Sequence, residues 1–200
     1  MENGEEKLVI AFFDFDGTVI KKDSFLCFIC FVKGRLKSWF GFILLSPFIV
    51  LYKLKLLHND KAKEIVFTFF FKGSGVESIK QKGKAFTKVI DKMLRPAAVD
   101  KINWHKRNKH KVYIVTASSE IWLGEWCRQN DLAIIATDFI TANGKLTGKI
   151  RGKNCYGPEK VSRIKAVCDL TVDTDIYAYG NSKGDLPMLE IANNRFYKRF

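Results

Sequence analysis

The sequence lacks an apolar run long enough to cross a membrane as a straight helix, and it is short of acidic residues. Its 34 Lys and Arg outnumber its 21 Asp and Glu, which leaves a net charge of +13. Its five cysteines are scattered and odd in number, so we expect reduced thiols rather than a disulfide framework. No internal repeat or low-complexity linker is present. Two hundred residues of this kind predict one core domain with a modest insertion.

The chain also opens without the features of a signal peptide. Residues 1–7 are acidic and polar, and the first apolar run begins only at Leu8. We therefore expect the catalytic face in the cytoplasm, at the inner face of the cell membrane if the chain binds lipid. Cys27 and Cys30 form a lone Cys-x-x-Cys within an apolar helical run. Without a second pair, packing in the core is favoured over a zinc or redox site.

The stretch 12–19 (Phe-Phe-Asp-Phe-Asp-Gly-Thr-Val) carries the most informative chemistry. An unbroken apolar run precedes it and predicts a buried strand. Asp14 and Asp16 are two residues apart, so an extended backbone points both carboxylates to the same side. Like charges this close favour a divalent cation held by oxygen ligands, most simply Mg²⁺. Gly17 allows a sharp turn directly after the acids.

The segment after this motif is helical in pattern and strongly basic. Residues 21–95 hold 16 Lys and Arg against 5 Asp and Glu, a net charge of +11. Such a segment attracts anions, which are phosphorylated substrates, nucleic acid or anionic lipid. Its apolar patterns predict helices over 25–32, 39–52, 60–72 and 76–93, with Gly73-Ser74-Gly75 as the break before the last.

The apolar part of this segment, 25–57, allows several interpretations. The stretch Trp39–Tyr52 is shorter than the roughly 20 residues of a membrane span. A buried helix pair, a re-entrant hairpin and an interfacial anchor all remain open. Pro47 breaks or kinks a helix at its middle, which suits a hairpin. Trp39, Tyr52 and the flanking lysines resemble interfacial residues. We favour contact with an anionic membrane over a soluble cap packed on itself.

The rest of the chain alternates strands and helices. Strand-like runs at 111–116, 132–136 and 175–179 alternate with helices at 120–130, from Pro158 and from Pro187, and Asn143-Gly144 marks a hairpin within 139–150. This alternation predicts an α/β fold with a doubly wound, mostly parallel, Rossmann-like sheet. The basic stretch 101–111 is explained by a solvated helix face, so we expect no nucleic-acid partner.

Polar side chains follow three of the predicted strands. They are Asp14 and Asp16, Thr116–Ser119, and Asn181 with Asp185, while Lys160 begins a helix. Ligand sites of open α/β sheets lie outside the carboxyl ends of the strands. Carboxylates, a hydroxyl, a lysine and an oxygen-rich loop suit phosphoryl transfer, in which one carboxylate attacks phosphorus and cationic groups neutralise the oxygens.

These residues, in this order and spacing, resemble the four motifs of the haloacid dehalogenase-like (HAD) phosphatases over essentially the whole chain. Within that superfamily the chain resembles the branch (subfamily IB) that holds phosphoserine phosphatase and phosphatidylglycerophosphatase C. The hairpin at 143–148 and the run Asn154–Lys160 are typical of that branch. The Asp23-Ser24-Phe25 start and the basic, apolar insertion most resemble phosphatidylglycerophosphatase C. The resemblance implies a HAD-like core at 1–20 and 96–200 and a helical cap at 21–95.

The resemblance also implies roles for the catalytic residues. Asp14 would be the nucleophile, forming an aspartyl phosphate, and a metal ligand. Asp16 would protonate the leaving alkoxide and then deprotonate the hydrolytic water, with its main-chain carbonyl on the metal. Thr116 would bind the phosphoryl oxygens, helped by backbone N–H groups around Ala117 and Gly17. Lys160 would neutralise Asp14 and the transferring group.

Further residues are implied in metal and substrate binding. Asn181 stands where many relatives carry a metal-binding aspartate, so this site has one negative charge fewer, and Asp185 is the second acid of that loop. Asp23 stands where phosphoserine phosphatases carry an acid that meets the substrate amine, and capping of the first cap helix is the equal alternative. Lys61 and Lys63 are candidates for binding a phosphate, with a solvated helix face as the simpler alternative. The implied function is Mg²⁺-dependent hydrolysis of a phosphomonoester, and the substrate we expect is a phosphorylated lipid head group such as that of phosphatidylglycerol phosphate.

Two rival functions remain open at this point. A soluble phosphatase for a small molecule such as phosphoserine would use the same catalytic residues with a different cap. The other rival is a non-enzymatic protein that binds a membrane or nucleic acid on a catalytically weak HAD-like scaffold, and Asn181 is the residue that favours it.

Overall fold

The computed structural model describes residues 8–171 and 173–200. Residues 1–7, on which the signal-peptide expectation depends, lie outside this part. In chain order the elements are β1 (Val9–Phe13), α1 (Ser24–Lys33), α2 (Arg35–Leu44), α3 (Ser46–Lys53), α4 (Asn59–Phe71), α5 (Val76–Asp91), α6 (Pro96–Arg107), β2 (Lys111–Thr116), α7 (Glu120–Gln129), β3 (Ala133–Ala136), β4 (Phe139–Ala142), β5 (Lys145–Ile150), α8 (Pro158–Val167), β6 (Asp175–Gly180), a 3₁₀ turn (Lys183–Asp185), α9 (Leu186–Glu190) and β7 (Asn194–Tyr197).

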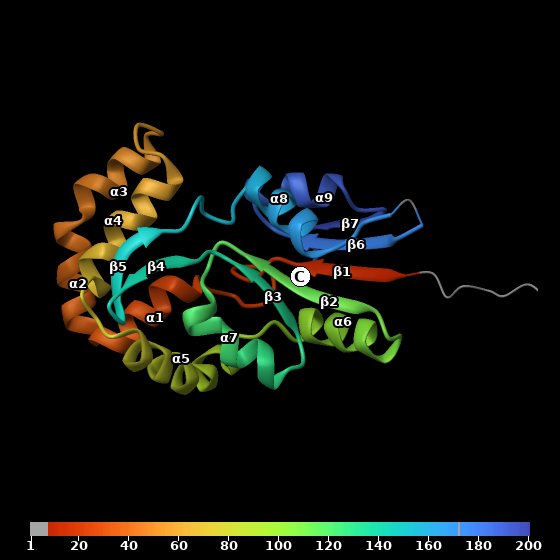
Figure 1. The fold of residues 1–200 in the computed structure, drawn as a ribbon, viewed down its shortest axis with the longest axis horizontal. Helices are drawn as coiled ribbons and strands as arrows, with labels where there is room; N and C mark the ends of the chain where they lie inside the picture. Colours follow the sequence, from red (N-terminus) through yellow and green to blue (C-terminus); the bar gives the residue numbers. More distant parts are fainter. Residues whose placement is uncertain (1–7, 172) are drawn as a thin grey trace, which may run out of the picture.

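A five-stranded parallel sheet forms the centre of the fold. Its order is β3-β2-β1-β6-β7, so β1 lies in the middle between β2 and β6. Helices α8 and α9 cover one face and α6 and α7 the other (Figure 1). Side chains 10–13 of β1 are all buried, as expected for a strand with apolar neighbours on both faces. The prediction of a doubly wound α/β fold is confirmed.

Helices α1–α5 lie together beyond the carboxyl ends of the strands (Figure 1). The antiparallel hairpin β4–β5 packs against α4, although it comes much later in the chain. Thr68 Oγ1 donates a hydrogen bond to the Gly148 carbonyl at 3.2 Å, and the Gly73 amide donates to the Leu146 carbonyl at 2.8 Å. The hairpin can approach α4 this closely because residue 148 is glycine, since a side chain there would collide with Thr68. The helical unit is thus completed by a hairpin from the second half of the chain.

The two connections between this helical unit and the sheet run beside each other. Ile20 and Leu94 form an antiparallel bridge. The Lys21 amide donates to the Met93 carbonyl, and the Arg95 amide donates to the Val19 carbonyl, each at 2.9 Å. Because the backbone is paired here, the path of the chain from β1 into α1 is fixed on both sides.

The apolar stretch folds as two short helices rather than one. Helices α2 and α3 meet at a bend of 61°, with Pro47 in the first turn of α3, as the proline predicted. Within the described residues no single helix has the length and composition of a membrane span, whereas this bent pair does. The helix face expected in the basic stretch 101–111 belongs to α6, which begins earlier, at Pro96. Strand β7 did not emerge as a predicted element, because it is a short edge strand with a mixed pattern.

Candidate active site

Asp14 stands at the carboxyl end of the central strand β1. Its Oδ1 accepts a hydrogen bond from Lys160 Nζ at 2.6 Å, and its Oδ2 accepts one from the Thr18 hydroxyl at 3.1 Å. Its own amide donates to the Tyr179 carbonyl on β6, which fixes the backbone. Burial raises the pKa of Asp14 to about 7, and Lys160 opposes that shift. The carboxylate is therefore desolvated and held from two sides.

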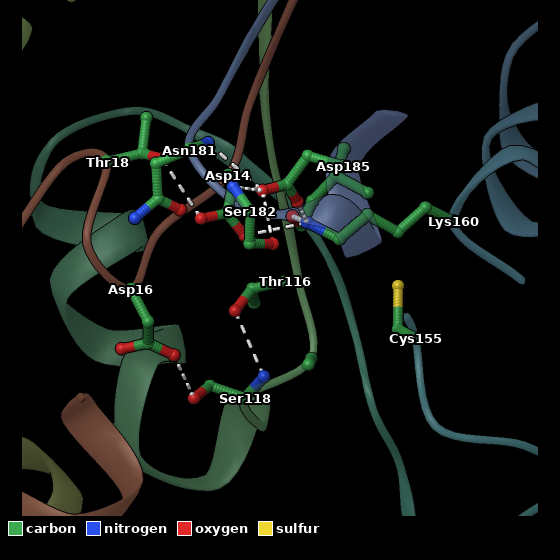
Figure 2. Close-up of polar contacts among 12 residues, drawn as sticks. Asp14, Asp16, Thr18, Thr116, Ser118, Cys155, Lys160, Asn181, Ser182 and Asp185 are labelled. Carbon is green, nitrogen blue, oxygen red and sulfur yellow. Dashed lines mark hydrogen bonds and ion pairs between the residues drawn. The ribbon is translucent and has the colours of Figure 1, made fainter. Parts of the chain in front are cut away.

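Lys160 is the buried cation of the site. It lies in the first turn of α8, which Pro158 helps to begin, and its side chain is 1% exposed. Nζ donates to Asp14 Oδ1, to Asp185 Oδ1 and to the Val115 carbonyl at 2.6, 2.6 and 2.8 Å (Figure 2). Burial lowers the pKa of Lys160, but the charges of the two carboxylates outweigh burial and raise it above its usual value. The lysine is therefore charged and links the ends of three strands, β1, β2 and β6.

Asp185 organises the loop that follows β6. Its Oδ2 accepts hydrogen bonds from the main-chain N–H groups of Asn181 and Ser182 at 3.1 and 2.8 Å, and from the Ser182 hydroxyl at 2.7 Å. Burial would raise its pKa, but Lys160 and these donors hold the pKa of Asp185 below its usual range. Both carboxylate oxygens are thus engaged by protein donors, and the structure uses Asp185 to hold Lys160 and the loop. Its expected share in metal binding remains a prediction.

The residues around Asp14 fit a hard divalent cation. Asn181 Oδ1 is buried without a hydrogen-bond partner in the described part of the chain. The side-chain amide of Asn181 packs against Gly17, so closely that a Cβ on Gly17 would collide with it. Gly17 has φ of 82°, a conformation that glycine adopts without strain. Asp14 and Asp185 carry two negative charges against one on Lys160, so a cation would balance the cluster. Asp14, the Asp16 carbonyl and Asn181 Oδ1 are the oxygens that would hold Mg²⁺.

The Asp16 side chain points away from Lys160, toward the loop after β2 (Figure 2). Its Oδ2 accepts from the Ser118 hydroxyl and its Oδ1 from the Ser24 amide, both at 2.6 Å. Burial raises the pKa of Asp16 to about 6, and the charge of Asp23 adds to the shift. Thr116 is fully buried, and its Oγ1 accepts from the Ser118 amide at 3.0 Å, which leaves its hydroxyl proton for another acceptor.

The expected substrate residues fall into two groups. Asp23 caps α1, because its Oδ1 accepts from the Leu26 amide at 2.9 Å, and it also lines the cavity beside the acids. Lys63 Nζ donates to the Ala117 carbonyl at 2.5 Å and to Asn154 Oδ1 at 3.2 Å, at the wall of the same cavity. Lys61 pairs with Glu64 at 3.3 Å and is 65% exposed. The two lysines, equivalent by sequence, are thus separated by the fold.

The cavity above the acids has a volume of about 540 Å³ and a mixed lining. Asp14, Asp16, Lys160 and Asp185 lie at one end. Apolar and aromatic side chains from the helical unit form much of the remaining wall; they are Phe25, Leu26, Phe42, Phe48, Ile49, Tyr52, Ala62 and Val66. The arrangement places a cluster of charged side chains at one end of a largely apolar pocket.

Three further polar residues of this site were not assigned to it from the sequence: Thr18, Ser24 and Asn154. Ser118 belongs to the expected polar run 116–119, but its hydrogen bond to Asp16 was not predicted. Thr18 lies four residues after Asp14 in the expected motif, so its hydroxyl was within reach of prediction. Ser24 and Ser118 are 94 positions apart, and no local pattern links them. Asn154 accepts from Thr137 at 2.7 Å and connects the loop before α8 to Lys63.

A doubly wound parallel sheet carries a buried acid pair, a lysine and a polar loop at its carboxyl edge, and an inserted helical unit covers them. This is the arrangement of a hydrolase with a Rossmann-like core and a cap. The chain belongs to the haloacid dehalogenase-like hydrolase family, whose family model matches residues 11–190. The predictions of the superfamily and of an enzyme are confirmed. The finer resemblance to phosphatidylglycerophosphatase C stays a prediction.

Three known proteins illustrate the similarity. Protein CicA of Caulobacter vibrioides is 34% identical over 202 residues, which cover 100% of this chain and 89% of that protein. The probable phosphatase Rv3661 of Mycobacterium tuberculosis is 30% identical and is matched over 90% of this chain and 65% of its own length. A solved phosphoserine phosphatase, described as a phospho-aspartyl intermediate analogue, superposes with a TM-score of 0.60 at 19% identity over 94% of this chain and 84% of that one. At this sequence identity, the similarity to the solved phosphoserine phosphatase shows a shared fold.

Proposed function

We propose that this protein is a Mg²⁺-dependent phosphatase that hydrolyses a phosphate monoester on a lipid head group at an anionic membrane. The observation that carries the proposal is the cavity that joins the buried acid–lysine cluster to a wall of aromatic and aliphatic side chains. A phosphate group suits the charged end, and an apolar tail suits the wall. The name of the relative Rv3661, a probable phosphatase, supports the reaction class.

The chemistry follows from the contacts of the acid pair. Asp14 attacks phosphorus, and the phosphoryl group passes to its carboxylate while the leaving oxygen departs. Asp16 donates a proton to that oxygen, and then takes a proton from the water that hydrolyses the aspartyl phosphate. Lys160 and the Thr116 hydroxyl stabilise negative charge on the phosphoryl oxygens. Mg²⁺, held by Asp14, the Asp16 carbonyl and Asn181, would supply further charge neutralisation when bound.

The lipid part of the proposal draws on the surface of α2 and α3. Residues 24–58 contain no Asp or Glu. On these helices Leu36, Trp39 and Phe40 are 86%, 68% and 65% exposed. Arg35, Lys37, Lys53 and Lys55 flank this apolar surface, which we call the α2–α3 face. Exposed aromatics between cations match an anionic lipid interface.

The same two helices also line the cavity. Phe42 comes from α2, and Phe48, Ile49 and Tyr52 come from α3. A helix pair that contacts lipid on one side and the substrate pocket on the other would let a lipid substrate reach Asp14 with its apolar part still shielded from water.

Phosphate release tests the reaction and the substrate together. Purified protein with Mg²⁺ is expected to release phosphate from phosphatidylglycerol phosphate in mixed micelles, faster than from phosphoserine, and Asp14→Asn is expected to abolish release. Preference for phosphoserine would support the soluble rival and contradict the lipid assignment. Absence of release from both substrates and from a generic aryl phosphate would contradict the enzyme assignment and favour the non-enzymatic rival.

Co-sedimentation with liposomes tests the α2–α3 face separately. The wild type is expected to sediment with vesicles containing anionic lipid, less so at high salt, and not with neutral vesicles. The double variant Trp39→Ser/Phe40→Ser is expected to lose most of this binding. Val167→Ser is the matched control, because Val167 is also exposed, at 61%, but lies at the end of α8. Equal loss in both variants would contradict the proposed face.

A further inference from the structure

A chain of buried hydrogen bonds runs from an indole to the Asp16 carboxylate. Trp122 Nε1 donates to Ser24 Oγ at 3.2 Å, Ser24 Oγ and Ser118 Oγ are 2.8 Å apart, and Ser118 Oγ donates to Asp16 Oδ2 at 2.6 Å. Ser24 and Trp122 are fully buried and Ser118 is 1% exposed. The members are thus screened from bulk water, and each depends on its protein partner.

The direction of this chain is set by its two ends. An indole N–H can only donate, and an ionised carboxylate can only accept. The Ser24 hydroxyl therefore accepts from Trp122 and donates to Ser118, whose hydroxyl donates to Asp16. The Ser24 amide donates separately to Asp16 Oδ1 at 2.6 Å. One lone pair on each Asp16 oxygen is thus occupied, and the others remain for proton exchange in the cavity.

The chain also joins the helical unit to the sheet domain. Ser24 lies in the first turn of α1, Ser118 follows β2, and Trp122 lies on α7. The Trp122 ring stacks on Phe25 and Phe28 of α1, with centroids 5.4 and 5.5 Å away. The position of α1 and the orientation of the Asp16 carboxylate therefore depend on the same contacts.

We propose that Ser24 and Ser118, anchored by Trp122, are positioning residues that aim the Asp16 carboxylate at the leaving oxygen, so that acid catalysis requires α1 to be seated against α7. The proposal rests on the proposed function, in which Asp16 exchanges protons with substrate. Beyond that function, it assigns a role to Ser24 of α1, which lies outside the family's four motifs: Ser24 orients Asp16 through the Ser118 hydroxyl.

The dependence of rate on the leaving group tests this relay. An alkyl phosphate such as glycerol phosphate needs a proton on its leaving oxygen, whereas 4-nitrophenyl phosphate has a leaving group that departs readily without one. In Ser118→Ala and Ser24→Ala we expect kcat/KM to fall about 10- to 100-fold for the alkyl phosphate. For the aryl phosphate we expect a fall of only about two- to threefold, because phosphoryl transfer to Asp14 remains.

Two variants sharpen the test. Trp122→Phe keeps the ring and removes the N–H, so we expect a smaller loss of about fivefold, again confined to the alkyl phosphate. Ser119→Ala is the matched control: this neighbouring buried serine accepts from the Ile121 amide at the start of α7 and is outside the relay. Ser119→Ala is expected to leave the ratio of the two kcat/KM values unchanged.

The outcomes separate the relay from the proposed function. If the wild type turns over both substrates, and Ser118→Ala and Ser24→Ala lower kcat/KM by the same factor for both substrates or for neither, the relay is overturned. The phosphatase assignment then stays intact. A wild type that turns over neither overturns the proposed function and the relay with it. A selective loss on the alkyl phosphate, with Ser119→Ala unaffected, supports the relay.

Discussion

Replacing Lys160 with Met gives the sharpest test of how the site is held together. The ammonium group is 1% exposed and bonds Asp14 and Asp185 at 2.6 Å each. Met has a similar length and keeps most of the packing, but it leaves two buried carboxylates without their cation. We therefore expect a large loss of stability in the metal-free protein, caused by charge rather than by a cavity.

The size of the effect follows from the loss of one partner in a buried ion pair. Such a loss typically costs about 3–5 kcal/mol. For a domain of 200 residues, each kcal/mol shifts Tm by about 2–4 °C, so Tm should fall by about 6–20 °C. The rate constant kcat should fall at least about 100-fold, because a charge-stabilising donor next to phosphorus is lost.

Thermal unfolding in the presence of EDTA, followed by circular dichroism, measures the Tm of the metal-free protein and so its loss of stability. Lys165→Met is the matched control, since Lys165 lies on the same helix but is exposed, and its Tm should stay within about 2 °C of wild type. The double variant Lys160→Met/Asp14→Asn removes one of the stranded charges and should be more stable than Lys160→Met alone. A Tm for Lys160→Met within the range of the control, or no recovery in the double variant, would contradict a loss of stability caused by the unpaired charges.

Three further predictions follow from the same structure. Asn181→Asp should tighten Mg²⁺ binding, measured by calorimetry, and lower the stability of the metal-free protein by about 1–3 kcal/mol, because it adds a carboxylate beside Asp14. Weaker Mg²⁺ binding together with lower stability, or tighter binding together with higher stability, would contradict the metal site. Burial raises the pKa of Asp14 to about 7 and of Asp16 to about 6, so the metal-free folded protein binds more protons than the unfolded chain from about pH 4 to 7. This stabilisation is complete below the unfolded pKa and lost as pH rises through these values, so Tm in EDTA should fall between pH 5 and 8, with a shallower fall in Asp14→Asn; identical slopes would count against it. Finally, a Cβ at Gly83 would collide with the Ile121 carbonyl oxygen on α7, so Gly83→Ala should destabilise the protein by about 1–3 kcal/mol in a denaturant titration, and an unchanged midpoint would contradict this contact.

Much of the core was readable from local sequence. The apolar run ending at Phe13 is long and β-branched enough to predict a buried strand, and it became the central strand. Asp14 and Asp185 were expected at one edge of the sheet because the carboxyl ends of parallel strands meet there, and Lys160, at the start of a helix, was expected beside Asp14 from the resemblance. The structure brings Lys160 within hydrogen-bond distance of both acids. The bend at Pro47 was likewise predictable, since proline removes a helix hydrogen bond.

Other features depended on contacts between distant segments. Lys61 and Lys63 have equivalent chemistry, and only the packing of α4 sends one to solvent and the other to the cavity wall. The β4–β5 hairpin gave a clear signal at Asn143-Gly144, but its place on α4 is set by a close approach that only Gly148 permits.

The sequence alone therefore determined which residues make up the candidate site: an acid pair after a buried strand, polar loops at two later strand ends and a lysine at the start of a helix. Periodicity, turn residues and motif spacing are local properties, and a parallel sheet converts them into neighbours in a predictable way. The tertiary structure decided which hydroxyls orient Asp16, what covers the cavity and which lysine faces it. Those contacts join Ser24 to Ser118 and α4 to β5, and no local pattern encodes a pairing of side chains across such separations.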